Sequence, residues 1–275
     1  MTQDTHPQLC FIGAGNMASA LIGGLIQRGH PPERITASDP DAGKLERLHR
    51  DFGIRTEGDN LSAATGADAV LLAVKPQVMK PVCTALAPLL PAPLFISIAA
   101  GLREDAIDRW LGGGKALVRC MPNTPALVGL GASGLHANPR VSVAQRQQAE
   151  AILQAVGMTV WVDDETQLDA VTAVSGSGPA YFFLFIEALQ NAGEAIGLDA
   201  PTAARLARQT ALGAARMAQE EDDIAALRQQ VTSPGGTTER AIQRFLEDGL
   251  PQTVERAVRA ARDRAAELAA ELGKD

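Results

Sequence analysis

Short apolar runs alternate with helical patterns through the first half of the chain. Apolar side chains dominate four such runs, at residues 9–12, 69–74, 94–98 and 116–121, and residues 34–38 are predicted as a further strand. Continuous runs of this kind are typical of strands that are buried on both faces of a sheet. The segments between them predict helices at 16–28, at 41–51 and from Pro76 onward. Strands and helices in this alternation indicate βαβ units and a parallel sheet.

The pattern changes in the second half of the chain. Residues 160–162 predict an edge strand, and no strand pattern follows them. Apolar residues share one helical face over 180–196 and again over 254–272, and Asp199 has the position of an N-cap between these segments. We therefore predict an all-α second half, with a domain boundary near residue 160. Its long apolar stripes favour burial against a second copy of the chain; the alternative is that they close only onto the first domain.

Length, net charge and cysteine content exclude several classes of function. The 275 residues suffice for one large domain or two smaller ones, and a net charge of −7 without a local basic cluster argues against a nucleic-acid partner. Three scattered cysteines without a C-x-x-C pair argue against a disulfide framework and a structural zinc site, and no metal site is predicted. The polar first residues do not form a signal peptide pattern, so a cytoplasmic protein is expected.

The longest uncharged stretch, from Pro81 to Leu102, is not interpreted as a membrane span. Its four prolines break a helical pattern, so a loop followed by a buried strand is predicted there, and no membrane partner is expected. These prolines are Pro81, Pro88, Pro91 and Pro93.

The side chains that most often carry catalytic protons are missing from the second half. No lysine lies between Lys115 and Lys274, and every histidine and cysteine lies before residue 137. A Schiff-base lysine, a histidine base and a thiolate nucleophile are therefore excluded from residues 137–273.

A glycine-rich turn follows the first predicted strand. Residues 13–18 read Gly-Ala-Gly-Asn-Met-Ala, a G-x-G-x-x-A pattern that opens the first predicted helix. The first glycine allows a tight turn, the second lets the backbone approach a pyrophosphate, and the helix N-terminus favours its charge. The pattern predicts a dinucleotide site that includes Gly13, Gly15, Asn16 and Met17.

The glycine turn, the strands and the later helices together predict the fold class. We expect an α/β protein with an N-terminal Rossmann-like parallel sheet domain that binds NAD(P), at residues 1–160. A helical domain for substrate binding and dimerisation, at residues 161–275, is expected to follow it.

The second predicted strand ends in Ser38 and Asp39. Asp39 lies 24 residues after Gly15, near the place where an acid binds the adenosine ribose 2′-hydroxyl, and this position favours NADH. If Asp39 instead caps the next helix, Ser38 and nearby main chain leave the pocket open to NADPH, so the predicted cofactor is NAD(P)H. Lys75, at the end of the strand over 69–74, either contacts the cofactor or is solvated at a helix start.

Two Gly/Ser-rich segments each open a helix in the second half, at 175–181 (Ser-Gly-Ser-Gly-Pro-Ala-Tyr) and at 232–239 (Thr-Ser-Pro-Gly-Gly-Thr-Thr-Glu). One such loop alone is usually a helix cap. Two of them in a region without Lys, His or Cys predict a cradle of backbone amides and hydroxyls for a small carboxylate.

The available side chains fit reduction of an imine better than reduction of a ketone. Hydride transfer to a ketone usually needs an acid for the developing alkoxide. A protonated cyclic imine already carries its proton, so the protein needs only to orient the substrate against the nicotinamide.

Six stretches of the chain together resemble the pyrroline-5-carboxylate reductase family, over residues 9–262. The resemblance implies reduction of the C=N bond of 1-pyrroline-5-carboxylate to L-proline by hydride transfer from NAD(P)H, the last step of proline biosynthesis. It also implies a helical domain that interleaves with a second subunit, and dimers that often assemble into decameric rings. The stretches are residues 11–18, 72–76, 97–101, 119–125, 175–181 and 231–238.

The resemblance implies roles for individual residues. The amides of 233–236 take the substrate carboxylate, and the Thr238 hydroxyl faces the ring nitrogen as the catalytic contact. Residues 220–225 lack a proline-containing turn of the family, which leaves a role for Glu221 open. Substrate contacts fall on Ser175, Ser233, Gly235, Gly236, Thr237 and Thr238. Cofactor contacts beyond the glycine turn fall on Ser38, Asp39, Asn60, Ala73, Val74, Lys75, Pro76, Ala99 and Asn123.

Other functions fit the sequence less well. A β-hydroxyacid dehydrogenase would use a lysine of the second domain, where this chain has none before Lys274. A deazaflavin-dependent NADP reductase resembles the first half but has no use for the two Gly/Ser-rich loops. A dinucleotide sensor without catalysis would need only the turn at 13–18, and an NAD(P)H-dependent reductase of a different cyclic imino acid is the alternative enzyme.

Overall fold

The structure is a computed structural model that describes residues 6–89 and 92–274. The expectations about the first five residues and about Pro91 therefore lie outside the described residues. The chain divides into two compact units, which are described separately. The first contains the chain up to Ser177 and again from Ala261, and the second contains Gly178–Ala260.

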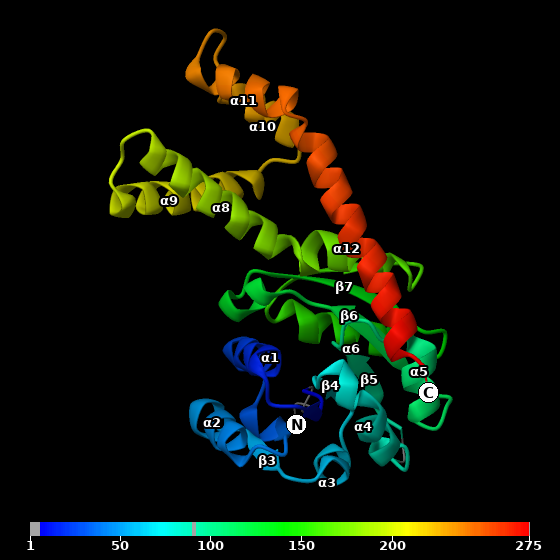
Figure 1. The fold of residues 1–275 in the computed structure, drawn as a ribbon. Helices are drawn as coiled ribbons and strands as arrows, with labels where there is room; N and C mark the ends of the chain where they lie inside the picture. Colours follow the sequence, from blue (N-terminus) through cyan, green and yellow to red (C-terminus); the bar gives the residue numbers. More distant parts are fainter. Residues whose placement is uncertain (1–5, 90–91, 275) are drawn as a thin grey trace. The chain divides into compact units, whose positions relative to one another are not determined.

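An eight-stranded sheet forms the centre of the first unit, in the order β3-β2-β1-β4-β5-β6-β7-β8 (Figure 1). The strands from β1 to β6 are parallel and have the order of dinucleotide-binding sheets. The predicted α/β class is confirmed. The strands are β1 Leu9–Ile12, β2 Ile35–Ser38, β3 Arg55–Glu57, β4 Ala69–Leu72, β5 Leu94–Ser97, β6 Leu117–Met121, β7 Gly131–Ala137 and β8 Gly157–Trp161.

One edge of the sheet departs from the parallel expectation. β7 runs antiparallel to β6, and β8 is parallel to β7, so the sheet is mixed. β8 lies at the edge and contains the first two of the three residues predicted for an edge strand at 160–162. The predicted parallel order therefore ends at β6, because the nine residues that join β6 to β7, at 122–130, are too few for the crossover that a parallel neighbour needs.

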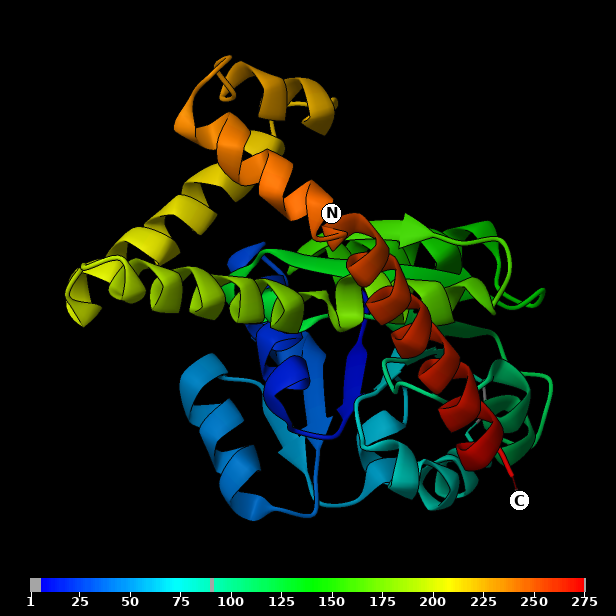
Figure 2. The same cartoon turned by 45° about the horizontal axis from the view of Figure 1, so that its top comes forward.

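Helices cover both faces of the sheet (Figure 2). Side chains alternate along each strand, so Leu9 and Phe11 pack in one core cluster while Cys10 and Ile12 pack in the other. The first cluster includes residues of α1 Asn16–Gln27, α2 Ala42–Phe52 and α6 Val143–Gln154. The second includes residues of α3 Asn60–Ala64, α4 Met79–Leu86 and α5 Glu104–Trp110.

The uncharged stretch contains a helix as well as a strand. Pro81 lies in the first turn of α4, where a proline costs no helical hydrogen bond, so the loop predicted at Pro81 is wrong. The buried strand predicted after it is β5. Among the described residues, none of the helices has the length and apolar character that crossing a membrane requires.

The second unit is helical. Asp199 caps α9 by accepting a hydrogen bond of 3.0 Å from the Thr202 amide, which confirms the predicted N-cap. The long helix α12 belongs to both units, and its last residues pack on the first unit, where Gly101 lies against Leu268 and Leu272. The helices are α8 Gly178–Ala195, α9 Ala200–Ala218, α10 Ile224–Gln230, α11 Thr237–Glu247 and α12 Leu250–Leu272.

These helices bury few of their own side chains. α10 and α11 have no buried residue, and α8 buries only Gly178. Phe182, Phe183 and Leu184 of α8 are 71%, 65% and 67% exposed. Because three successive residues point to different sides of a helix, α8 is apolar and uncovered on more than one side.

Candidate active site

Predicted cofactor residues follow the carboxyl ends of five parallel strands. The strand order reverses between β1 and β4, which is the place where open α/β sheets bind their ligands. The loops after these two strands touch: a Cβ atom on Gly13 would lie 2.5 Å from the Ala73 oxygen. The residues brought to this edge are Gly13 after β1, Asp39 after β2, Ala73 after β4, Ala99 after β5 and Asn123 after β6.

The glycine turn is open on the side where a pyrophosphate would approach. Gly13 has φ +107°, which a side chain rarely adopts, and a Cβ atom on Gly15 would meet nothing within 4 Å. Gly15 and Asn16 are exposed, and α1 begins without a side-chain cap. Its first-turn amides therefore remain available for an anion, and the residues present fit a dinucleotide.

Asp39 is buried, and its carboxylate is engaged by the protein. It accepts hydrogen bonds from the Ala14 amide (2.8 Å) and the Asp41 amide (3.0 Å), and the Lys44 ammonium lies 3.4 Å away. Burial raises the pKa of Asp39, but these hydrogen bonds and Lys44 outweigh it and hold the pKa below its usual value. The residue that caps α2 is Asp41, which accepts from the Gly43 and Lys44 amides.

The Ser38 side chain is hydrogen-bonded to the side chain of Asn60. Ser38 is fully buried and donates a hydrogen bond of 2.8 Å to the Asn60 side-chain oxygen. Asn60 begins α3, whose N-cap is Asp59. These contacts fix the amide of Asn60 beside the end of β2, and the sequence did not predict the pair.

The segment after β4 has an exposed cation. Lys75 is exposed and forms no ion pair with another described residue, and Pro76 begins a 3-10 turn at Pro76–Val78. Val74 packs on the second core cluster. Ala99, after β5, is buried, and its amide donates to the Ser97 hydroxyl at 3.4 Å. Of the four residues Val74, Lys75, Pro76 and Ala99, Lys75 is the exposed one.

Asn123 and Ser175 are joined in the first unit. The Asn123 side chain is 8% exposed, donates to the Ser175 carbonyl at 3.0 Å and accepts from the Ala132 amide at 2.9 Å. Ser175 lies in a π-helical turn at Thr172–Gly176, where its hydroxyl donates to the Val171 carbonyl. The predicted nicotinamide segment and the first Gly/Ser-rich loop are thus held together, by a wide turn of a kind found at functional sites.

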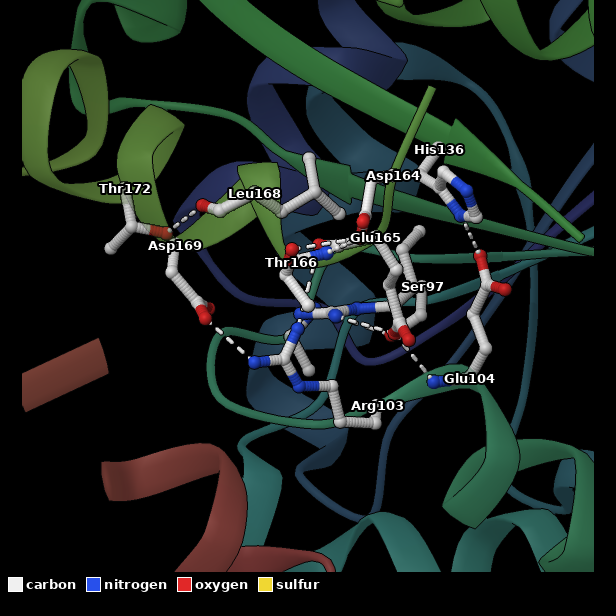
Figure 3. A network of polar contacts seen from close by, with 12 residues as sticks. Ser97, Arg103, Glu104, His136, Asp164, Glu165, Thr166, Leu168, Asp169 and Thr172 are labelled. Carbon is white, nitrogen blue, oxygen red and sulfur yellow. Dashed lines mark hydrogen bonds and ion pairs between the residues drawn. The ribbon is translucent and has the colours of Figure 1, made fainter. Parts of the chain in front are cut away.

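A charged network leads into this π-helical turn (Figure 3). Glu165 accepts from the buried Arg119 side chain at 2.6 Å and from the Glu104 amide at 2.7 Å, and Arg103 pairs with Asp169 at 2.6 Å. Asp169 belongs to α7 Gln167–Val171, which continues into the turn. Buried charges paired in this way fix one arrangement of the segments that carry them.

The same network contains a histidine–carboxylate pair. The His136 ring lies 2.7 Å from the Glu104 carboxylate. Burial raises the pKa of Glu104, and the hydrogen bond with His136 opposes that effect. Sequence reasoning missed the network because its members come from separate segments without a shared motif.

In the second unit, two backbone amides of the loop before α11 already form local hydrogen bonds. The Gly235 amide donates to the Glu239 carboxylate at 2.7 Å, and the Gly236 amide donates to the Ser233 carbonyl at 3.0 Å. Gly236 caps α11 without a side-chain hydrogen bond, and Thr238 is exposed. The amides of the first turn of α11 are therefore the ones left open to a carboxylate.

The segment that departs from the family pattern forms its own cap. Asp223 accepts from the Ala225 and Ala226 amides and begins α10, and Glu221 accepts from the Asp223 amide at 3.4 Å. No proline is needed to start this helix. The structure gives Glu221 this local contact.

The cysteines of the first unit supply no nucleophile. Cys10, Cys83 and Cys120 are buried, and burial raises the pKa of each thiol to about 12. All three are thiols at neutral pH.

Two family profiles match the chain. The profile described as "Pyrroline-5-carboxylate reductase dimerisation" matches residues 165–268. The profile described as "NADP oxidoreductase coenzyme F420-dependent" matches residues 8–101. The second match covers the glycine turn and agrees with the likeness of the first half to deazaflavin-dependent NADP reductases.

Relatives match along nearly the whole chain. A pyrroline-5-carboxylate reductase of Pseudomonas aeruginosa is 55% identical, over 98% of this chain and 99% of its own length. The structure of a pyrroline-5-carboxylate reductase from Coxiella burnetii has a TM-score of 0.93 at 46% identity, covering 96% of this chain and 99% of its own. That of the Plasmodium falciparum pyrroline carboxylate reductase with NADP bound has a TM-score of 0.83 at 30% identity, covering 96% and 98%.

Proposed function

The chain belongs to the pyrroline-5-carboxylate reductase family, and on that premise we propose how its residues divide the work of the reaction. The enzyme reduces 1-pyrroline-5-carboxylate to L-proline with NAD(P)H. The observation that carries this conclusion is the 55% identity along almost the whole chain, together with an open glycine turn at the end of β1.

Residues 1–160 hold the cofactor, and residues 161–275 hold the substrate and associate with a second copy. The first assignment is supported by the sheet order and by the residues gathered at its carboxyl edge. The second is supported by the dimerisation profile over 165–268.

The first turn of α1 binds the cofactor's pyrophosphate through its free amides. Bound NAD(P)H supplies the hydride. Lys75, which has no ionic partner among the described residues, is free to meet a phosphate or ribose. The proposed cofactor residues are Gly13, Gly15, Asn16, Met17, Ser38, Asp39, Asn60, Ala73, Val74, Lys75, Pro76, Ala99 and Asn123.

The loop before α11 binds the substrate carboxylate. Since the Gly235 amide is held by Glu239 and the Gly236 amide by the Ser233 carbonyl, the carboxylate either binds the amides of Thr237 and Thr238 or displaces Glu239. Both routes keep the anion at a helix N-terminus, where its charge is favoured. Ser175, Ser233, Gly235, Gly236, Thr237 and Thr238 are the proposed substrate residues.

Thr238 is the proposed catalytic contact. Its exposed hydroxyl accepts a hydrogen bond from the N–H of the protonated ring nitrogen and orients the imine. The substrate enters as an iminium cation, and the added hydride converts C=N⁺–H to an amine, so no side chain has to supply a proton. This matches a second half without lysine or histidine between residues 137 and 273.

Self-association through the helical region completes the fold. Phe182, Phe183 and Leu184 expose large apolar side chains on more than one side of α8, and monomers rarely leave so much apolar surface uncovered. A second copy offers the same apolar surface, and in a two-fold symmetric dimer the same patch of each subunit meets its counterpart. We place the enzyme in the cytoplasm, because its three cysteines are unpaired thiols, and at the last step of proline biosynthesis.

Oxidation of NADH and of NADPH by the purified chain, in parallel and with 1-pyrroline-5-carboxylate, tests the function. We expect turnover and stoichiometric L-proline. Cofactor binding without turnover would contradict the assignment, and activity on the six-membered cyclic imine alone would identify a reductase of another imino acid. Inactivity on both imines with intact cofactor binding would identify a sensor.

A further inference from the structure

We propose that Asp39 is a positioning residue for the glycine turn, rather than the acceptor of the ribose 2′-hydroxyl that its place after β2 indicates. The inference rests on the proposed function, because it concerns how this chain holds NAD(P)H. It predicts that the carboxylate supports NADH and NADPH equally.

The carboxylate has no acceptor site left for a ribose. Oδ1 accepts from the Asp41 amide at 3.0 Å and lies 3.4 Å from the Lys44 ammonium. Oδ2 accepts from the Ala14 amide at 2.8 Å and lies 3.5 Å from the same ammonium. An ionised carboxylate offers about four lone-pair sites, and these four contacts use them.

The contact with Ala14 acts on the turn itself. Gly13 donates its amide to the Ser38 carbonyl at 2.7 Å, and Ala14 donates its amide to Asp39. The end of β2 therefore takes the first two amides of the turn and fixes their direction. The amides from Gly15 onward stay free, at a place where Gly15 and Asn16 are exposed.

Lys44 makes this arrangement compatible with a bound anion. A bare carboxylate beside the turn would repel a pyrophosphate. Lys44 lies between both oxygens of Asp39 and neutralises their charge, and its side chain is 40% exposed against 9% for Asp39. Lys44 thus offsets the charge of Asp39 before the cofactor binds.

Ribose acceptance and positioning make different predictions. An acid that accepts the 2′-hydroxyl favours NADH and repels the 2′-phosphate of NADPH. Its loss weakens NADH and ADP-ribose, which both carry that hydroxyl, and leaves NADPH binding unchanged or stronger. An acid that fixes the turn serves the pyrophosphate, which both cofactors share. Its loss weakens NADH, NADPH and ADP-ribose together.

Titration calorimetry with the full-length Asp39→Asn variant distinguishes ribose acceptance from positioning of the turn. Asparagine has one oxygen and one NH₂ group, so one of the Ala14 and Asp41 amides must face a donor. We expect the dissociation constants for NADH, NADPH and ADP-ribose each to rise about tenfold, as loss of a charge-assisted hydrogen bond predicts, with the NADH to NADPH ratio within about threefold of wild type. The KM for 1-pyrroline-5-carboxylate should stay unchanged, which general loosening of the fold would not allow.

Weakening of NADH and ADP-ribose without weakening of NADPH, or unchanged binding of all three ligands, would overturn the proposal. Asp41→Asn is the matched control, because it removes the same charge two residues away and asparagine caps helices as well as aspartate does. It should leave all three constants within about twofold of wild type, where a general charge effect would change them. A wild-type chain that binds none of the three ligands would overturn the proposed function itself.

A second measurement does not use Asp39→Asn and covers the case in which that variant does not fold. Affinity for ADP is compared with that for 2′-deoxy-ADP, which lacks only the 2′-hydroxyl, in wild type and in Asn60→Ala, because Asn60 is another proposed cofactor contact at this end of β2. Since Asp39 has no acceptor site for this hydroxyl, we expect the two affinities to agree within about threefold in Asn60→Ala. A loss of tenfold or more that persists in Asn60→Ala would contradict the proposal.

Discussion

In the first unit, every residue of β1, β2, β4 and β5 is buried, whereas α10 and α11 of the second unit bury none of their residues. The first region is stabilised by contacts within one chain, with helices over both faces of its sheet. The second has amphipathic helices whose apolar sides stay uncovered. The difference teaches that the packing of one region can be understood from a single chain, while the other presents apolar surface that its own chain does not bury.

A carboxylate introduced on the exposed apolar helix α8 should have the largest effect, on self-association. In Phe183→Asp, assembly would bury an unpaired carboxylate, which costs several kcal/mol and raises the dissociation constant of the assembly about a thousandfold. Light scattering after size exclusion should show the mass of one chain, where wild type shows a larger one.

Val143→Asp makes the matching change in the first unit. Val143 is 75% exposed and begins α6, where an acid suits the helix N-terminus. Its assembly should match wild type. A Phe183→Asp variant with wild-type mass, or a Val143→Asp variant that dissociates, would remove the distinction between the regions.

Close main-chain packing around Gly13 in the first unit predicts the second-largest effect, on the stability of the fold. Gly13→Ala combines φ +107° with a Cβ atom 2.5 Å from the Ala73 oxygen, so the loops after β1 and β4 must separate. Gly66→Ala has φ +78° and meets nothing within 4 Å, so it carries the backbone strain alone. Urea denaturation should show Gly13→Ala less stable than Gly66→Ala by about 2 kcal/mol, the usual cost of overpacking. Equal losses would mean that the loops are not in close contact.

Removal of the Thr238 hydroxyl tests whether the second unit contributes a contact to the reaction. Thr238→Ala should lower kcat/KM for the imine by about ten- to a hundredfold, the usual loss for one hydrogen bond to a charged group. Thr238→Ser keeps the hydroxyl and should recover most of the rate, while NADPH affinity stays at the wild-type value in both. An unchanged kcat/KM in Thr238→Ala would exclude this residue from the reaction.

The smallest effect is a pH dependence in the first unit. The folded pKa of Asp39 lies below its unfolded value, so the carboxylate stabilises the fold above about pH 4 and loses that contribution as the pH falls through the folded value. Wild type should exceed Asp39→Asn in unfolding free energy by about 1.5 kcal/mol at pH 7, and by less at pH 3. A difference that stays constant down to pH 3 would show that the ionised carboxylate is not what stabilises the turn.

Sequence patterns predicted the buried strands because their surroundings dictate their composition. β1, β2, β4, β5 and β6 lie inside the sheet, so their sequences contain few charged residues, and β1, β4 and β5 appear as apolar runs. β3 is a short polar edge strand, and β7 consists of Gly-Ala-Ser-Gly-Leu-His-Ala, where Gly134 leaves room for Val171. Neither has an apolar run, so both were missed, and with β7 the antiparallel turn of the sheet.

The predicted site residues divide in the same way. The glycine turn was identifiable because Gly13, Gly15 and Ala18 hold the three positions of the motif that require a small residue. The contacts of Asp39, Asn123 and Glu239 were not, since each depends on which amide lies within reach in three dimensions. A carboxylate after β2 looks the same in sequence whether it accepts from a ribose or from Ala14.

Transfer of deuterium from NADPH labelled at both C4 positions of the nicotinamide tests the central claim most directly. The purified chain is incubated with this cofactor and 1-pyrroline-5-carboxylate, and the proline is analysed by mass spectrometry. An imine reductase with the proposed roles places one deuterium on C5 of L-proline, because the hydride goes to the imine carbon and the nitrogen keeps its own proton. Proline without deuterium at C5, or no proline while the cofactor binds, would contradict the account.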